Sequence, residues 1–283
     1  MLLSMDSGIS ALSHLQDSLN VTANNIANVQ TTGFKSGSVS FADTFSETLG
    51  GGNAAGALQI GTGMGTASIK NQFSQGSISS TGNANDMAIT SPNGFFLVKD
   101  PATQNTFATR DGSFSVDAGG YLITNGGMRV QGYSDTALAT LGDIKIDNTG
   151  ATIVDSTGAT VPDLSLVKSF AFGSDGRLKV QLADGNSFTR GQVLLQNFTS
   201  PQQLLKVGSN LYSGLSTAGP LAAPTAPGSN GLGALQTGAL EMSNVDLAKE
   251  LTTLITTQRA FEANSKVITT SDEILNTLVH LKN

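Results

Sequence analysis

The chain has 283 residues, of which 13% are charged, and its formal net charge is −6. This balance, without a basic cluster, argues against a nucleic-acid partner, because the phosphate backbone is bound by Lys and Arg. The absence of cysteine excludes disulfides and thiolate metal sites. No apolar run approaches the roughly 18 to 20 residues that cross a bilayer, so we expect no membrane insertion. The N-terminus lacks a basic segment before its apolar residues, so we expect no cleaved signal peptide.

A helix is predicted over residues 2–29, because apolar residues recur there at steps of three and four. Such spacing places them on one stripe that must be buried against another helix. Gly33 follows this stretch and suits the left-handed position just after a helix end. The predicted stripe contains Met5, Ile9, Leu12, Leu19 and Ile26.

Residues 36–68 are predicted to form an extended connector, because glycine, serine and alanine dominate this stretch. Two explanations stay open. The stretch is either an ordinary flexible linker or a segment that becomes ordered only on contact with other subunits.

Between residues 69 and 211 the apolar period changes to two, which predicts β-structure. Short apolar runs alternate with Asn-Gly and Asp-Gly pairs that favour tight hairpin turns. Residues 69–133 are expected to form a core β-domain, to which residues 191–211 return. Residues 134–190 either extend this domain or form a small outer β-domain, and we favour the second. The pair beginning at Arg110 is expected to open a hairpin turn.

Residues 212–242, with several Gly and Pro, are predicted to form a second extended connector. A long helix is then predicted over residues 243–281, with Ser243 or Asn244 as its N-cap and Asp246 in its first turn. Its apolar residues recur every seven positions, which predicts a partner helix. The predicted stripe contains Leu247, Leu251, Leu254, Phe261, Ile268 and Leu275.

Together these segments predict an α+β fold. The helices of residues 1–35 and 243–283 are expected to form a coiled-coil-like inner domain, with mainly-β outer domains between them. Stripes at both ends of one chain favour pairing of the termini with each other or with neighbouring subunits. That arrangement is typical of a protein that assembles.

No catalytic, cofactor-binding or metal site is predicted. His14 and His280 lie in the terminal helices without clustered carboxylates, so no metal site is assembled locally. The glycines of residues 61–65 lack the preceding strand and following helix of a nucleotide-binding loop. An alternative of another class is a secreted enzyme or ligand-binding β-protein with helical ends.

Motifs at the helix ends resemble the flagellar rod and hook protein family. Residues 23–35 are ANNIANVQTTGFK, residues 237–246 are TGALEMSNVD and residues 258–265 are QRAFEANS. In the interior, residues 75–83 (QGSISSTGN) and 109–114 (TRDGSF) resemble the core β-domain of the family. The matches follow the order of the family. The motif residues are Asn24, Asn25, Asn28, Gly33, Phe34, Asn244, Gln258, Arg259 and Asn264.

The resemblance implies a self-assembling, extracellular tube subunit of the hook or basal body of the bacterial flagellum. It implies paired terminal helices in the inner layer of the tube, with β-domains pointing outward. The implied route is export of the unfolded chain through the flagellar type III apparatus. The implied partners are further copies of the chain, the distal rod protein, and the hook cap and hook–filament junction proteins. No enzymatic activity and no cofactor are implied.

Within the family, residues 34–45 and 273–282 favour a hook subunit, which would form a flexible tube transmitting torque from rod to filament. The short span of residues 134–190 is nearer in length to rod proteins. A distal rod subunit therefore stays as the alternative.

Overall fold

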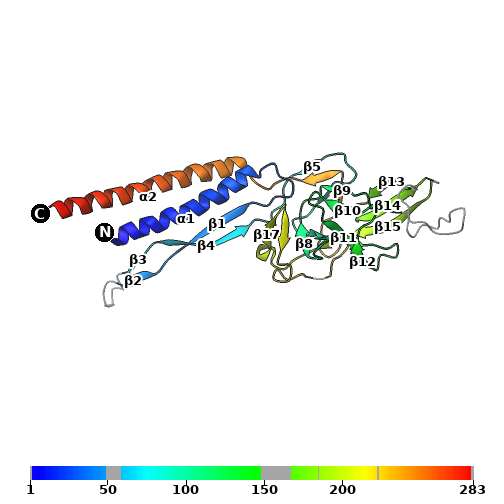
Figure 1. Cartoon of the computed structure of the whole chain (residues 1–283), viewed down its shortest axis with the longest axis horizontal. Helices are drawn as coiled ribbons and strands as arrows, with labels where there is room; N and C mark the ends of the chain where they lie inside the picture. Colours follow the sequence, from blue (N-terminus) through cyan, green and yellow to red (C-terminus); the bar gives the residue numbers. More distant parts are fainter. Residues whose placement is uncertain (1, 49–58, 148–166, 184, 222, 282–283) are drawn as a thin grey trace. The chain divides into compact units, whose positions relative to one another are not determined.

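The computed structural model describes residues 2–48, 59–147, 167–183, 185–221 and 223–281, and it divides into two units (Figure 1). The helical ends belong to unit 1, which comprises Met1–Val29, Ser36–Gln72 and Val245–Asn283. The β-rich middle belongs to unit 2, which comprises Gln30–Lys35 and Phe73–Asn244. Helices at both ends and a mostly-β middle confirm the predicted α+β class.

In unit 1, helix α1 (Leu2–Ala27) and helix α2 (Leu247–Leu281) lie side by side (Figure 1). The helices approach closely at Gly8, because a Cβ at this position would lie 3.2 Å from Cγ1 of Ile268. A side chain at residue 8 would therefore require the Ile268 side chain to shift.

Helix α2 begins three to four residues after the predicted N-cap. The Oδ1 atom of Asp246 accepts hydrogen bonds from the backbone N–H groups of Ala248 (3.0 Å) and Lys249 (3.2 Å). Asp246 is therefore the N-cap, in place of Ser243 or Asn244, and it satisfies N–H groups that have no partner within the helix.

Where an extended connector was expected over residues 36–68, the structure has two antiparallel strand pairs. Strand β1 (Gly37–Asp43) pairs with β4 (Met64–Asn71), and β2 (Ser46–Thr48) pairs with β3 (Gln59–Gly61). Backbone hydrogen bonds hold these strands, so small side chains do not prevent their pairing. Part of the expected connector, residues 49–58, lies outside the described residues.

The β1–β4 pair is attached to α1 by polar side chains. The amide of Asn25 donates to the carbonyl of Gly37 (2.8 Å) and accepts from its N–H group (2.9 Å). Farther along the helix, the hydroxyl of Thr66 donates to Asp17 (3.1 Å) and lies 2.9 Å from Nδ1 of His14. The strand pair is thus fixed in register against α1.

Unit 2 is built on one antiparallel sheet. Its strands are β7 (Phe95–Lys99), β8 (Thr106–Thr109), β9 (Phe114–Val116), β10 (Leu122–Thr124), β11 (Arg129–Tyr133), β12 (Leu141–Asp143), β13 (Val167–Phe172), β14 (Arg177–Leu182), β15 (Ser187–Val193), β16 (Leu195–Gln196), β17 (Leu205–Gly208) and β18 (Leu211–Ser213). The main order is β13-β14-β15-β11-β7-β8-β18-β17, and β9, β10, β12 and β16 pair at its sides.

Residues 134–190 contribute to this same sheet. Strand β15 pairs with β11, where Gly132 lies opposite Val193, so the described strands show no break at residue 134. Residues 148–166, which belong to the expected outer domain, lie outside the described residues.

Residues 212–242, which were expected to form an extended connector, belong to unit 2 and contribute two strands to it. Strand β19 (Leu235–Thr237) pairs with β6 (Met87–Ile89), and β20 (Ala239–Glu241) pairs with β5 (Ile78–Ser80). The one other regular element is a short 3₁₀ helix at Pro201–Gln203, among the described residues. The last strand of unit 2 thus lies only a few residues before α2.

The core of unit 2 lies on both faces of β7, because successive side chains of a strand point to opposite faces. Phe96 and Val98 pack into the larger apolar cluster, and Phe95 packs into a smaller one. In the smaller cluster, Phe73 packs edge-on against both Phe95 and Tyr212, with ring centroids 5.4 Å apart in each pair. Each fully buried aromatic side chain contributes about 1.5–3 kcal/mol relative to an exposed position.

Candidate assembly surfaces and a buried charge cluster

The predicted stripe on α2 is covered along most of its length. Leu254, Phe261, Ile268 and Leu275 are half-buried, whereas Leu247 and Leu251 are each 44% exposed. On α1, Ile9 is 51% exposed. The other predicted positions on α1 are half-buried: Met5, Leu12, Leu19 and Ile26.

The most buried side chains of α2 are two small polar residues, Thr257 and Ser271. The Thr257 hydroxyl donates to the carbonyl of Thr253 (2.8 Å), and the Ser271 hydroxyl donates to that of Val267 (2.8 Å). Because each hydroxyl is satisfied within its own helix, burying it costs little. Their small size allows a close approach of neighbouring elements.

Apolar side chains also remain exposed on both sides of the covered stripe of α2. With 3.6 residues per turn, Leu247, Leu251 and Ile255 lie on one flank, and Val267, Ile274 and Leu278 lie on the other. Each of these six is between 43% and 56% exposed. Exposed apolar side chains grouped on a helix in this way are candidates for a protein–protein contact. We call these two sets the flanks of α2.

The asparagines of the first motif satisfy backbone groups within the chain. The side chain of Asn28 donates to the backbone carbonyl and to Oδ1 of Asn24, both at 2.9 Å. Asn25 is buried and bonds Gly37 as described above. Asn28 thus bonds a carbonyl of the last turn of α1, whereas Asn25 satisfies the backbone of the first residue of β1.

Gly33 has a different role from the expected one. Helix α1 ends at Ala27, so Gly33 is not its terminating residue. Its φ is +67°, and a Cβ there would lie 2.6 Å from the backbone nitrogen of Asp111. Only glycine combines this conformation with such close contact. The next residue, Phe34, is buried, and Nζ of Lys206 lies 4.3 Å from its ring centroid.

The motif residues of the C-terminal part fall into two groups. The Asn244 amide donates to the hydroxyl of Ser74 (2.9 Å) inside unit 2, and the Asn264 amide donates to a carbonyl of its own helix, that of Ala260 (3.0 Å). The other two, Gln258 and Arg259, are exposed, and Arg259 forms only a surface ion pair with Glu262 (2.8 Å).

Unit 2 contains a buried cluster of three charged side chains. The Glu241 carboxylate accepts from Nζ of Lys35 at 2.6 Å through Oε1 and from Nη1 of Arg110 at 3.1 Å through Oε2. All three side chains have no exposed surface. Oε1 also accepts from the N–H group of Gly76 (3.0 Å), and Nζ of Lys35 donates to the carbonyl of Ser74 (2.7 Å).

Arg110 lies inside the unit, although a hairpin turn was expected at this residue. Its Nη1 donates to the carbonyl of Ser91 (3.0 Å), and its Nη2 donates to that of Pro92. Its guanidinium carbon lies 5.1 Å from the ring centroid of Phe95. Among the described residues, its Nε is the one buried side-chain N or O atom without a hydrogen-bond partner.

The cluster contains two cations and one anion, so its balance depends on Glu241. Burial lowers the pKa of Lys35 and of Arg110 below their usual values, and the Glu241 carboxylate opposes this by favouring both charged forms. A buried charge that loses its partner is far more costly than an exposed one. The carboxylate of Glu241 therefore compensates both cations together.

The sequence alone gave little indication of this cluster. Lys35 and Glu241 are separated by 206 positions, so no local spacing joins them. The one indication in the sequence was that Lys35 and Glu241 are charged residues within family motifs, in a chain that has few charges. Glu241 also lies between Leu240 and Met242, where an exposed carboxylate would be expected from the alternation of a strand.

The described residues contain no group of three or more His, Asp or Glu side chains placed to hold a metal ion. Within the same parts of the chain, neither α1 nor α2 has an apolar stretch of the length that crosses a membrane. Two long helices that lie side by side, with apolar flanks left exposed on α2, are features typical of proteins that associate with other chains.

Three families match successive parts of the sequence. Residues 5–35 match the family described as flagella basal body rod protein. Residues 89–180 match the flagellar hook protein FlgE/F/G D1 domain, and residues 236–281 match the flagellar basal body rod FlgEFG protein C-terminal family.

Similar proteins extend over the whole chain. The flagellar basal-body rod protein FlgG of Bacillus subtilis is 40% identical over 289 residues and covers 100% of both chains. The flagellar hook protein FlgE of Borreliella burgdorferi is 27% identical over 446 residues, again with 100% of both. A crystal structure of Helicobacter pylori flagellar hook protein FlgE2 aligns at a TM-score of only 0.22 and 15% identity, over 66% of this chain and 47% of that one. The chain belongs to the flagellar rod and hook protein family, and it is a structural component of the flagellum.

We predict that Glu241→Gln destabilises unit 2 by about 3–5 kcal/mol, because it leaves two cations buried without an anion. Urea unfolding followed by tyrosine fluorescence and circular dichroism measures the loss. Glu262→Gln is the matched control, since it removes the same charge from an exposed pair with Arg259. Equal midpoints for the two variants would contradict the compensating role of Glu241.

A second prediction concerns alkaline pH. Burial raises the pKa of the Tyr212 phenol above its usual value near 10. The unfolded chain therefore loses this proton at lower pH than the folded chain. Ionisation of Tyr212 therefore leaves the free energy of unfolding unchanged below about pH 10. Above that pH it lowers the free energy of unfolding, by at most about 1.4 kcal/mol per pH unit. Urea titrations from pH 9 to 12 should show a shallower loss for Tyr212→Phe than for the natural chain. The same loss of stability with pH in both proteins would refute the attribution of this pH dependence to Tyr212.

Proposed function

We propose that this chain is the distal rod subunit of the flagellar basal body, a shaft that transmits torque from motor to hook. The observation that carries the proposal is length. The Bacillus subtilis rod protein aligns from end to end over 289 residues. The hook protein alignment needs 446 residues to cover both chains, so the hook relative has long segments that this chain lacks.

This proposal reverses the preference drawn from residues 34–45 and 273–282, which favoured a hook subunit. Residues 273–281 lie in the segment that matches the FlgEFG C-terminal family, so they discriminate poorly between rod and hook proteins. The short span of residues 134–190 was the better indicator. A hook subunit stays as the second candidate, supported by the full-length similarity to the Borreliella hook protein.

We infer further that the subunit forms a helical homopolymer whose inner layer is made of α1 and α2. The support comes from unit 1: the two helices lie side by side, and the flanks of α2 stay exposed. In such a polymer, the flanks of α2 would pack as a coiled-coil-like layer against helices of neighbouring copies. Repetition of a heterologous contact that does not close produces an open helical assembly.

The remaining parts of the proposal follow from family membership. The subunit would be exported through the flagellar type III apparatus and would have no enzymatic activity. Its neighbours would be other rod subunits on one side and the hook protein on the other. A secreted enzyme or ligand-binding protein, the alternative of another class, would require activity or ligand affinity in the intact chain.

Electron microscopy of basal bodies from cells that lack this gene tests the assignment. A distal rod subunit predicts a shortened rod without a hook, restored by the intact chain. A complete rod that lacks only the hook would instead make the chain a hook subunit. Normal flagella would refute both assignments.

We predict that Leu254→Asp or Phe261→Asp abolishes polymer formation, because each places an unpaired carboxylate in the covered stripe of α2. Sedimentation and electron microscopy of the purified chain measure assembly, and circular dichroism reports whether unit 2 stays folded. Thr252→Asp is the control, since it adds the same charge to an exposed position of the same helix that lies between the two flanks, away from the stripe. Assembly of the Leu254 and Phe261 variants at the natural level would remove the role of the stripe.

A further inference from the structure

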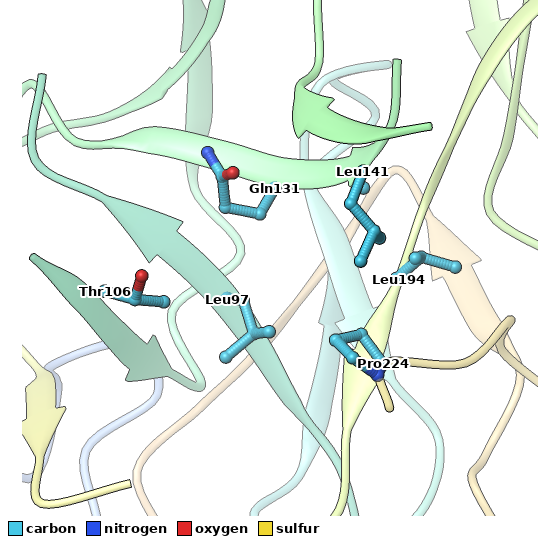
Figure 2. A pocket seen from close by; sticks show the side chains of 7 residues that line it. Leu97, Thr106, Gln131, Leu141, Leu194 and Pro224 are labelled. Atoms are coloured by element: carbon cyan, nitrogen blue, oxygen red, sulfur yellow. The ribbon is translucent and has the colours of Figure 1, made fainter. Parts of the chain in front are cut away.

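An open apolar pocket lies on the sheet of unit 2 (Figure 2). Its volume is about 140 Å³, and apolar residues of β7, β12 and two neighbouring segments form most of its wall. Leu97 and Leu194 are buried, whereas Leu141 is 56% exposed. The labelled side chains are Leu97, Thr106, Gln131, Leu141, Leu194 and Pro224.

The chemistry of this pocket selects an uncharged, apolar occupant. Its polar side chains, Thr106 and Gln131, carry no charge, and no ionisable group lines it. A dry cavity of about 150 Å³ lined by apolar side chains is large enough to bind benzene. The pocket therefore has room for one aromatic ring.

The most exposed large apolar side chain of the described residues is Phe45, at 92%. It lies in unit 1, between β1 and β2. Its backbone is nevertheless fixed, because its carbonyl accepts from both the N–H group (3.0 Å) and the hydroxyl (2.6 Å) of Thr62. Next to it, the Thr44 N–H group donates to the carbonyl of Gly63 (3.0 Å). A ring presented on a fixed backbone loses little entropy when it binds.

We propose that Phe45 of one copy inserts into this pocket of a second copy of the chain. The match rests on size, on the absence of charge from the pocket and on the exposure of the ring. Phe45 belongs to unit 1 and the pocket belongs to unit 2, so the contact joins unlike parts of two copies and can repeat from copy to copy. This inference rests on the proposed homopolymer and adds a contact outside the terminal helices.

Photo-cross-linking tests the contact while an aromatic ring stays at residue 45. Phe45→p-azidophenylalanine is assembled with isotopically labelled natural chain, illuminated and mapped by mass spectrometry. We expect cross-links between labelled and unlabelled copies that end at Leu97, Leu141, Leu194 or Pro224. Cross-links confined to a single copy, or ending elsewhere in a normal polymer, would overturn the proposal while leaving assembly intact. Failure of the natural chain to polymerise would refute the homopolymer, and this contact with it.

Polymer affinity gives a second measurement. Phe45→Ala should raise the critical concentration for assembly by about tenfold or more, as truncation of a central aromatic anchor does. Phe41→Ala is the matched control, because Phe41 lies in the adjoining strand β1 and is 41% exposed. Equal critical concentrations for the two variants would overturn the role of Phe45.

Discussion

The carboxylate of Glu241 connects three segments of unit 2 that are far apart in sequence. It binds Lys35, from the segment that enters the unit, together with the backbone of Gly76 and the guanidinium of Arg110. A carboxylate without exposed surface is stable only if its acceptor sites are filled, and these donors fill them. The segments that carry Lys35, Gly76 and Arg110 are therefore held together by one carboxylate.

The motifs of the flagellar rod and hook family serve two purposes in this chain. Some residues stabilise the fold: Gly33 permits a close backbone contact, and Asn25 fastens β1 to α1. Others, such as Gln258 and Arg259, are exposed and have no comparable structural role within the described chain. The flanks of α2 are likewise exposed, although they lie outside these motifs. The fold thus accounts for the first group of motif residues, and the exposed residues are left for the contacts proposed with other copies.

Periodicity predicted most of the secondary structure, because it reports local burial. The heptad spacing located α2, and two-residue alternation with glycine turns located β7 to β10. It failed where side chains carry no pattern: β1 and β4 are held by backbone hydrogen bonds and by Asn25, which composition does not reveal. Arg110 was misplaced for a related reason. Its partners come from distant segments, and an isolated Arg-Asp pair resembles a turn in every local respect.

The distance of 206 positions between Lys35 and Glu241 also orders events in time. A chain that emerges with its N-terminus first presents Lys35 early and Glu241 only near the end. Until then the first strand segments of unit 2 lack their closing partner, and loop closure over such a separation is slow. In the proposed export of the unfolded chain, this late pairing would discourage folding before passage is complete. Because Glu241 precedes α2 by only a few residues, the β-unit would be completed shortly before the helix that carries the flanks.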